Sequence, residues 1–262
     1  MQRTLQGVRA YRNLAAEVYH LDKPVGHSFG DVEFYGELLA GATGPIFEPA
    51  AGNGRVLIPL ALDGHTASAA EPSPDMRRLF EQAAAAAGVD VPVGSGLFTD
   101  IDAVEAYEAV IIPAGSIQLL TSPAETRAAL TRMHRSLVAG GRLIFDLDAL
   151  GGLFASSASA RSWPTDDGLI TLTETIESID PSTQTRTSQL RYERWVDGLL
   201  AESQLEHFIL RFWGLHEMCA LLELCGFVDV ELHGDYRRGA PVTSSTEVTT
   251  VVAAKAAATS RP

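Results

Sequence analysis

The sequence has 262 residues, of which 46% are hydrophobic and 20% charged, and its formal net charge is −13 at pH 7. This length suffices for one large domain, or a domain with a subdomain, whose core needs no disulfide or metal to hold it together. The acidity disfavours a nucleic-acid partner, because nucleic-acid affinity depends on Lys and Arg that neutralise phosphates.

No apolar run reaches the roughly 20 residues of a membrane span, and the first 20 residues lack the apolar core of a signal peptide. The two cysteines, Cys219 and Cys225, have a spacing typical of neither a metal site nor a disulfide framework. We therefore expect a cytoplasmic protein without a bound metal or a membrane partner. Assembly as a homo-oligomer is left open.

Residues 1–40 are predicted to be helical, with a break at Lys23–Gly26 and a second helix from Asp31 to Leu39. The apolar positions that recur at three- and four-residue spacing include Tyr11 and Tyr19, two turns apart on one helix face. Two roles are open for these tyrosines: packing in the core, or forming part of a helical lid over a ligand. Asp31 and Arg55 either pair with each other, which would fix this segment to the core, or are solvated separately.

Residues 41–150 alternate between short apolar runs and helical stretches. The predicted strands are 45–49, 66–70, 91–93, 109–113 and 142–147, the last after a turn at Gly140-Gly141. The predicted helices are 54–61, 74–87 and 123–137. This order is typical of α/β proteins with a doubly wound, mostly parallel sheet.

The β-rich segment 168–212 interrupts that rhythm, with predicted strands over 169–179, 185–196 and 201–212. Alternating Thr and apolar residues predict an inserted antiparallel meander. Residues 213–255 then return to the core with a helix over 215–225 and two strands over 228–233 and 246–253. We expect the meander to be packed by Trp195, Phe208, Phe212 and Trp213, any one of which could instead wall a pocket.

The segment from Ile46 to Arg55 indicates a ligand site, since it is a strand, a Gly-containing turn and the start of a helix. Ligands of doubly wound sheets bind at the carboxyl ends of the strands, where glycines allow close approach. The segment lacks the Lys-Ser/Thr of a phosphate loop and the G-x-G-x-x-G of a dinucleotide site. Glu48 would repel a pyrophosphate, so a cationic ligand is favoured. Glu71 ends the next predicted strand, where its two oxygens can accept both hydroxyls of a ribose.

These two motifs resemble those of the class I methyltransferases that depend on S-adenosylmethionine (SAM). The family pattern acid-x-Gly-x-Gly-x-Gly appears as Glu48-x-Ala50-x-Gly52-x-Gly54, with Ala50 in place of the first glycine. The family pattern Asp-x-Ser-x-x-Met appears as Glu71-Pro72-Ser73-Pro74-Asp75-Met76. The resemblance covers residues 30–150 best. It implies that SAM is the cofactor, that Glu71 binds its ribose, and that Pro72 and Met76 lie beside its adenine.

The remaining family motifs depart further from the pattern. Leu97 and Phe98 follow the third predicted strand, where the family often has an Asp, and the resemblance implies that they wall the adenine. Pro113 and Ser116 end the fourth strand, where the family places the methyl donor beside the acceptor.

The inserted meander and the lid tyrosines resemble small-molecule N-methyltransferases of antibiotic biosynthesis, such as those acting on aminosugars. The expected function is therefore methyl transfer by in-line displacement to a small-molecule acceptor, with an amine nitrogen favoured. No catalytic base stands out, and the candidates are Tyr19, His20, His216 and Asp146. Alternatives are an O-methyltransferase, a non-catalytic SAM-binding or scaffold protein, and a nucleotide-sugar or NAD-type enzyme, against which Glu48 argues.

Overall fold

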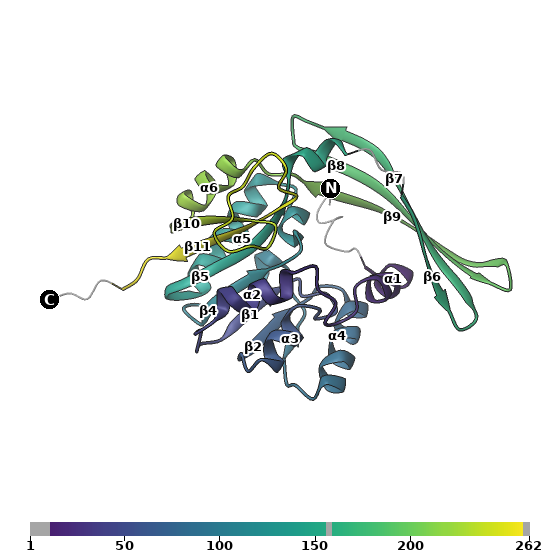
Figure 1. Cartoon of the computed structure of the whole chain (residues 1–262), viewed down its shortest axis with the longest axis horizontal. Coiled ribbons are helices and arrows are strands. Elements are labelled where there is room, and N and C mark those ends of the chain that lie inside the picture. Colours follow the sequence, from purple (N-terminus) through teal and green to yellow (C-terminus); the bar gives the residue numbers. More distant parts are fainter. Residues whose placement is uncertain (1–10, 156–158, 259–262) are drawn as a thin grey trace.

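Two β-sheets of different construction make up the protein (Figure 1). The computed structural model describes residues 11–155 and 159–258. Seven strands form a sheet in the order β10-β11-β5-β4-β1-β2-β3, and four form a second sheet in the order β6-β7-β8-β9. The first sheet comprises β1 (Ile46–Pro49), β2 (Ala67–Ala70), β3 (Val93–Gly94), β4 (Tyr107–Ile112), β5 (Leu137–Asp148), β10 (Phe227–Gly234) and β11 (Val248–Lys255).

The larger sheet is mostly parallel, as the sequence predicts. β1 pairs in parallel with β2 and with β4, and β5 runs parallel to β4. Only β11 and β10 are antiparallel, β11 to β5 and β10 to β11. The predicted doubly wound α/β fold is confirmed, together with the hairpin that closes it.

Helices cover both faces of this sheet and bury it from either side. They are α2 (Asp31–Leu39), α3 (Leu57–Leu62), α4 (Pro74–Ala87), α5 (Pro123–Ser136) and α6 (Leu215–Leu224). One apolar cluster includes Leu130, Met133 and Leu222 of α5 and α6, and the other includes Phe34 and Phe80 of α2 and α4. Burial on both faces explains why the central strands are continuous apolar runs. None of the helices in the described ranges is long and apolar enough to cross a membrane.

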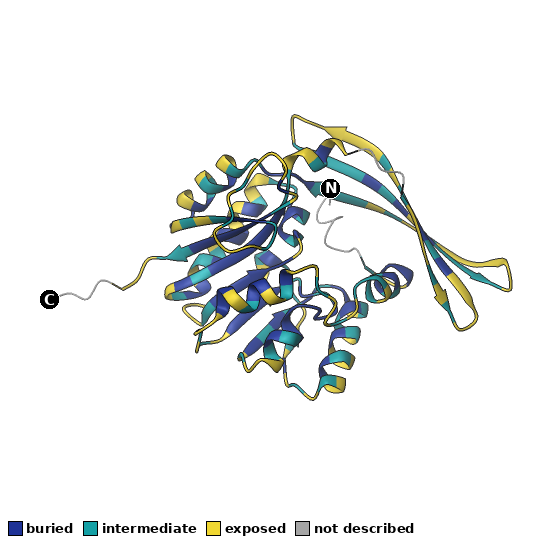
Figure 2. Cartoon of the chain, viewed as in Figure 1, coloured by how far each residue is buried: buried dark blue, intermediate teal, exposed yellow. Residues whose placement is uncertain are grey.

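The second sheet is a long antiparallel meander that extends away from the core (Figure 1). It comprises β6 (Ser159–Thr165), β7 (Gly168–Asp180), β8 (Thr185–Val196) and β9 (Leu199–Arg211). Helix α1 (Leu14–Asp22) packs Leu14 and Val18 against Ile170 and Leu190 of the sheet. The ends of the sheet farthest from the core are largely exposed (Figure 2).

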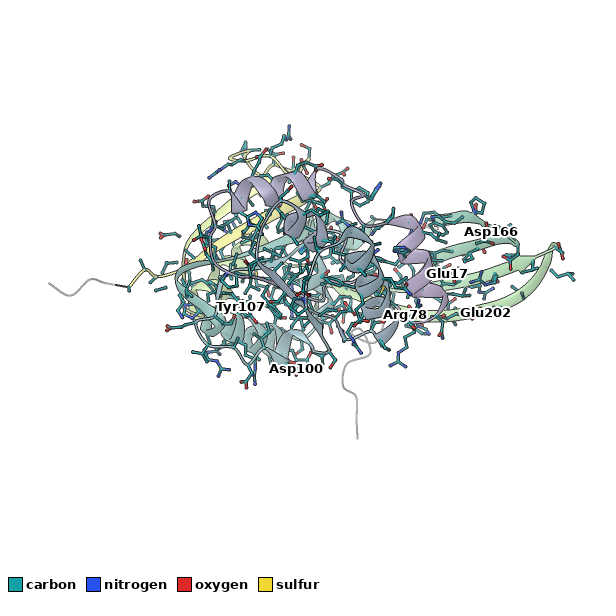
Figure 3. The ribbon with its side chains drawn as sticks, turned by 90° about the horizontal axis from the view of Figure 1, so that it is seen from below. Glu17, Arg78, Asp100, Tyr107, Asp166 and Glu202 are labelled. Atoms are coloured by element: carbon teal, nitrogen blue, oxygen red, sulfur yellow. The ribbon has the colours of Figure 1, made fainter. Side chains whose placement is uncertain are left out.

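Polar contacts from α1 also join the sheet to the core. Glu17 of α1 accepts from Arg194 of β8 at 2.5 Å, and Figure 3 shows Glu17 beside these strands. The backbone N–H of Asn13 donates to Asp75 of α4 at 3.0 Å. Helix α1 and the residue before it therefore contact β6 and β8 of the antiparallel sheet on one side and α4 of the core on the other.

Several predicted boundaries were wrong. Helix α3 begins at Leu57 rather than Gly54, because the positive φ of Gly54 (83°) belongs to a turn. The pair Gly140-Gly141 lies inside β5, where a Cβ on Gly141 would be 3.0 Å from the Glu108 carbonyl oxygen of β4. Strand β6 was not predicted, and its Pro164 is typical of an edge strand. Leu5 and Val8, predicted to be helical, lie outside the described residues.

Three short 3-10 helices complete the described fold: η1 (Phe98–Asp100), η2 (Ser116–Leu119) and η3 (Leu150–Phe154). Two of them follow the third and fourth strands at the carboxyl edge of the sheet. That edge faces α1 and the antiparallel sheet, so residues from both sheets meet there.

Candidate active site

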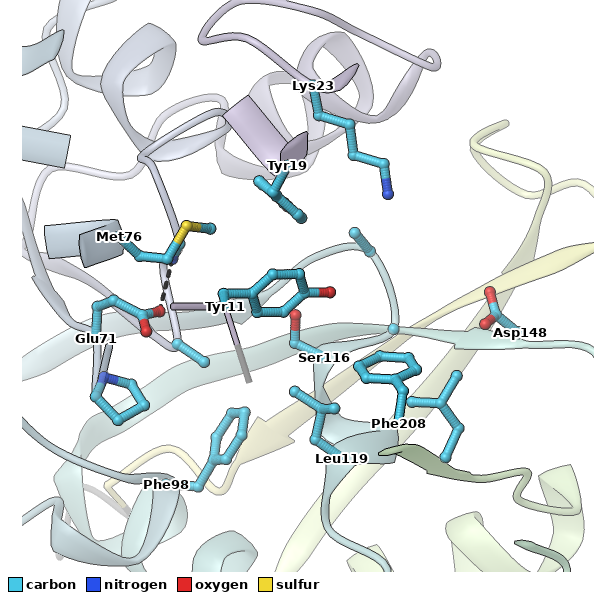
Figure 4. A pocket seen from close by; sticks show the side chains of 16 residues that line it. Tyr11, Tyr19, Lys23, Glu71, Met76, Phe98, Ser116, Leu119, Asp148 and Phe208 are labelled. Carbon is cyan, nitrogen blue, oxygen red and sulfur yellow. Dashed lines mark hydrogen bonds between the residues drawn. The ribbon is translucent and has the colours of Figure 1, made fainter. Parts of the chain in front are cut away.

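A cavity of about 240 Å³ lies at the carboxyl ends of the parallel strands, between the core and the antiparallel sheet (Figure 4). Its lining comes from the turn after β1, the segment after β2, the residues after β4, the end of β5, the N-terminal segment and β9. The lining residues are Tyr11, Tyr19, Lys23, Ala50, Gly52, Glu71, Pro72, Met76, Phe98, Ala114, Gly115, Ser116, Leu119, Asp148, Phe208 and Leu210.

The turn after β1 forms one wall with its backbone. Ala50, Gly52 and Gly54 all have positive φ, at 56°, 59° and 83°. Ala50 is the residue that replaces a glycine of the family pattern, and it adopts the left-handed conformation that favours glycine. A Cβ on Gly52 would lie 3.4 Å from Met76 Cε and 3.8 Å from Tyr19 Cε1, which are ordinary contact distances, so the positive φ is what favours glycine here.

Glu71 is a buried carboxylate fixed by backbone donors. Its Oε2 accepts from the N–H of Gly52 at 2.9 Å, the dashed line in Figure 4, and its Oε1 accepts from the N–H of Ser73 at 2.7 Å. Burial raises the pKa of Glu71, although these hydrogen bonds and the nearby charge of Arg77 oppose the shift. Each carboxylate oxygen has a second lone pair, so both remain able to accept from a ligand hydroxyl.

Apolar side chains surround this carboxylate. Pro72, Met76 and Phe98 line the cavity next to Glu71, and Met76 and Phe98 are almost completely buried (Figure 4). A flat ring fits such a wall, with hydroxyl groups directed to the carboxylate. Leu97, predicted to share this wall, does not line the cavity, because its backbone N–H is turned to the carboxylate of Asp100 at 2.9 Å.

Tyr11 and Tyr19 close the cavity on the side of α1. The predicted shared helix face was wrong, because Tyr11 precedes α1 and has a positive φ of 67°. Their rings meet edge to face with centroids 5.0 Å apart, and Tyr11 also contacts Phe208 of β9. The backbone carbonyl of Tyr11 accepts from Ser73 Oγ at 2.6 Å, which fixes the tyrosine beside Glu71. Burial raises the pKa of both phenols, so both are hydroxyl groups at neutral pH. Both tyrosines line the cavity, and Tyr11 also packs against the apolar cluster of α1 and the antiparallel sheet, so both roles stay open.

Lys23 and Asp148 lie toward the other end of the cavity from Glu71 (Figure 4). Lys23 follows α1, and Asp148 is the last residue of β5. Burial lowers the pKa of the Lys23 ammonium and raises that of the Asp148 carboxyl. Sequence reasoning missed Lys23, because a lysine in a Lys-Pro break is common on protein surfaces, and it favoured a surface or capping role for Asp148 at its strand end.

Glu48 of β1 and Gly54 of the following turn do not line the cavity. Glu48 is buried, its Oε2 has no hydrogen-bond partner in the described structure, and burial raises the pKa of its carboxyl. A Cβ on Gly54 would lie 2.8 Å from Phe80 Cδ2, so this glycine allows α4 to pack closely. Pro113 is buried and does not line the cavity either, whereas Ser116 does.

The structure does not bring three of the four candidate bases to the cavity. His20 Nδ1 contacts the side-chain nitrogen of Asn53 at 3.1 Å beneath the turn, and His216 is exposed on α6. Asp146 is completely buried and accepts from Ala114 N at 2.8 Å and Thr250 Oγ1 at 2.7 Å. Tyr19 alone lines the cavity. Among the described residues there is also no cluster of acidic, His or Cys side chains able to hold a metal ion.

Known structures match the chain over nearly its whole length. A SAM-dependent methyltransferase from Clostridium acetobutylicum is 13% identical, with a TM-score of 0.75 over 92% of this chain and 97% of the other. The CcbJ methyltransferase from Streptomyces caelestis is 21% identical, with a TM-score of 0.75 over 98% and 100%. The sugar N-methyltransferase KedS8 from Streptoalloteichus is 18% identical, with a TM-score of 0.73 over 92% of each chain.

No protein-family model matches the chain, and no curated protein sequence matches it. The structural matches show that the chain has the fold of the SAM-dependent methyltransferases. At these low identities the likeness shows the fold alone. The resemblance that the motifs suggested is confirmed at that level.

Proposed function

We propose that this protein transfers a methyl group from SAM to a small-molecule acceptor. The observation that carries the proposal is the arrangement around Glu71: a carboxylate fixed by two backbone N–H groups, a turn without a Cβ at Gly52, and an apolar wall of Pro72, Met76 and Phe98. A ribose with an adjoining aromatic base is complementary to this arrangement.

The residues of the cavity fit each part of SAM. Glu71 would accept from the ribose hydroxyls, and Met76 and Phe98 would enclose the adenine. The other end of SAM is an amino acid, whose carboxylate requires a cation and hydrogen-bonding groups. Lys23 would supply the cation, since its ammonium lies 5.3 Å from the Tyr19 ring centroid at the cavity, and no carboxylate within the described residues lies within 4 Å of it. SAM bound here would supply a methyl group made electrophilic by its sulfonium.

The protein's own contribution is alignment and exclusion of water. Tyr11 and Tyr19 close one side, and Phe208 and Leu210 of β9 close the side toward the antiparallel sheet. Holding two reactants in line in this way can lower the barrier by about 7–11 kcal/mol. The charge of a sulfonium is dispersed as it reacts, so an apolar enclosure favours the reaction.

The acceptor that we favour is an amine nitrogen of a small metabolite in antibiotic biosynthesis, acted on in the cytoplasm. The neighbours include proteins described as a sugar N-methyltransferase and as an amino pentose methyltransferase of calicheamicin biosynthesis. A hydroxyl acceptor would require a base at the methyl-transfer point. Of the four candidate bases from the sequence, Tyr19 alone lines the cavity, and burial raises the pKa of its phenol.

Calorimetric titration with SAM and with S-adenosylhomocysteine tests the proposal. We expect Glu71→Gln and Glu71→Ala to weaken binding by about 10- to 100-fold, since hydrogen bonds to a charged group contribute roughly 1.5–3 kcal/mol. Glu81→Ala, an exposed glutamate on α4, is the matched control and should leave binding unchanged. Circular dichroism establishes that each variant folds.

Absence of binding by both ligands would contradict the proposal, and binding of NAD in their place would favour a dinucleotide enzyme on the same fold. Binding of both ligands without turnover of any amine or hydroxyl acceptor would indicate the non-catalytic alternative.

A further inference from the structure

The backbone of Asp148 is held in place by a buried side chain that joins the two sheets. The backbone N–H of Asp148 donates to Gln118 Oε1 at 2.9 Å, and Gln118 Nε2 donates to the carbonyl of Arg211 at 3.1 Å. Gln118 is completely buried. The end of β5 is therefore fixed relative to β9, whose Phe208 and Leu210 wall the same cavity.

This carboxylate has no partner of its own within the described residues. None of the hydrogen bonds there involves its oxygens, and none of the ion pairs within 4 Å does. Arg186 is the first of two cations that lower the pKa of Asp148 against the effect of burial, and Lys23 is the second. The Arg186 guanidinium is already engaged, since it donates to the Gly152 carbonyl at 2.7 Å and lies 5.1 Å from the Phe212 ring centroid.

Asp148 also borders a second, more open cavity. This groove has a volume of about 590 Å³ and shares Lys23, Ala114 and Asp148 with the first cavity. It lies between the start of α2 and the connection from β10 to β11. Its acidic lining residues besides Asp148 are Asp235, Glu247 and Asp31, the last of which is paired with Arg55, whereas Lys23 is its one basic lining residue among those described. Such a groove concentrates cations and repels anions.

We propose that the acceptor is a small molecule with a protonated amine, which enters through this groove, and that Asp148 binds the ammonium and takes up its proton. The inference rests on the proposed methyl transfer. An ammonium has no lone pair, so it must lose a proton before it can attack carbon. Its N–H bond breaks, the electron pair stays on nitrogen and the proton passes to the Asp148 carboxylate. The N–C bond then forms as the donor's C–S bond breaks, with that electron pair remaining on sulfur.

The geometry explains why Asp148, and not Asp146, does this. Asp146 lies two residues earlier on β5, is completely buried, and its oxygens already accept from Ala114 and Thr250. Asp148 is half-buried, unpaired among the described residues and open to both cavities. A carboxylate that is partly desolvated and opens onto the cavity is suited to accepting a proton.

Binding of a matched pair of probes tests the inference without turnover. Benzylamine and benzyl alcohol have the same ring, which suits the wall of Phe208 and Leu210, but only benzylamine is a cation. We expect the protein loaded with S-adenosylhomocysteine to bind benzylamine at least about ten-fold more tightly at pH 7. Asp148→Asn should abolish that preference, and Asp63→Asn, an exposed aspartate after α3, should retain it.

The pH dependence separates a titrating carboxylate from a merely structural residue. The preference for benzylamine should be lost as the pH falls through the pKa of Asp148, and Asp148→Asn should show no such loss. The charged or titratable groups that act on Asp148 or share the groove with it are Lys23, Asp31, Arg186, Asp235, Tyr236 and Glu247, and Asp31 among them is paired with Arg55.

Equal binding of the two probes, binding of neither, or a preference that survives Asp148→Asn would overturn the inference. Failure of the proposed function is distinguishable, because it would appear as absent binding of S-adenosylhomocysteine to the wild-type protein. The two probes can then be titrated into the free protein, where their preference still reports on Asp148.

Discussion

The guanidinium of Arg55 and the carboxylate of Asp31 form an ion pair in which both groups are almost completely buried. Arg55 Nη1 donates to Asp31 Oδ1 at 3.0 Å, and Nη2 donates to Oδ2. The pair joins the first residue of α2 to the turn before α3. Of the two arrangements that the sequence left open, pairing is the one that the structure shows.

Removing one member of this pair should be strongly destabilising. Burial raises the pKa of Asp31, but the hydrogen bond and charge of Arg55 lower it further, so the net pKa is depressed. Its stabilising effect is therefore present above the unfolded pKa and lost as pH falls through the folded one. We expect Asp31→Asn to cost about 3–5 kcal/mol at pH 7, because Arg55 keeps an uncompensated buried charge. Urea unfolding measures this cost.

The exposed pair of Arg135 and Asp102, 2.9 Å apart, is the control for that experiment. Asp102→Asn should cost less than about 1 kcal/mol, because solvent screens exposed charges. Similar losses for Asp31→Asn and Asp102→Asn would show that burial of the first pair has no energetic consequence.

Asp146 should make the protein less stable as the pH rises. Burial raises its pKa from 3.8 to about 7, against the hydrogen bonds from Thr250 and Ala114. Between these values the folded protein binds a proton that the unfolded chain has lost, so the free energy of unfolding falls with increasing pH. We expect the difference in that free energy between wild type and Asp146→Asn to change by up to about 1.4 kcal/mol per pH unit.

Unfolding in urea at pH 5, 6 and 7 measures that difference. Asp146→Asn mimics the protonated carboxyl and cannot ionise, so it should lose less stability than the wild type over this range. Parallel curves for the two proteins would show that Asp146 keeps its ordinary pKa.

Ala50 carries backbone strain in the cavity wall. Its φ of 56° costs a residue with a Cβ about 1–2 kcal/mol, and glycine avoids this cost. Glycine also makes the unfolded chain more flexible, which offsets about 0.4–1 kcal/mol. Ala50→Gly should therefore raise the free energy of unfolding by about 1 kcal/mol or less, with an unchanged denaturant slope.

Ala51 is the matched control, because it is buried next to Ala50 and its φ is not positive. Ala51→Gly should destabilise the protein, since it adds flexibility to the unfolded chain and relieves no strain. Destabilisation of equal size by both substitutions would refute the strain at Ala50.

Gly54 should be far less tolerant of a methyl group than glycines in open turns. A Cβ there would be 2.6 Å from Ile58 Cδ1 and 2.8 Å from Phe80 Cδ2, both on side chains that are completely buried. Gly41 has the same φ of 83°, and a Cβ added to it would meet nothing within 4 Å. Gly41→Ala should cost about 1–2 kcal/mol from backbone strain alone.

Gly54→Ala should add about 1–3 kcal/mol to that cost, because the packed core must shift. Thermal unfolding of both variants gives the comparison. A Gly54→Ala variant no less stable than Gly41→Ala would show that Ile58 and Phe80 move aside freely.

The sequence by itself determined most of the fold. The alternation of short apolar runs with helical periodicity identified the parallel sheet, and turn residues such as Ser73 and Gly88 marked the ends of α4. These signals are local, so they can be read without knowing what packs where. Glu71 and Gly52 were identifiable for a similar reason, since both follow strands whose ends must lie at one edge of the sheet.

Only the tertiary structure decided which other side chains reach the cavity. Lys23, Asp148 and Leu210 come from three elements far apart in the sequence, and their convergence depends on how α1 and the antiparallel sheet pack on the core. The same packing turned His20 toward Asn53 and left His216 exposed. Asp146 and Asp148 differ by two positions on one strand, yet only long-range contacts made the first a paired core residue and left the second open to a ligand.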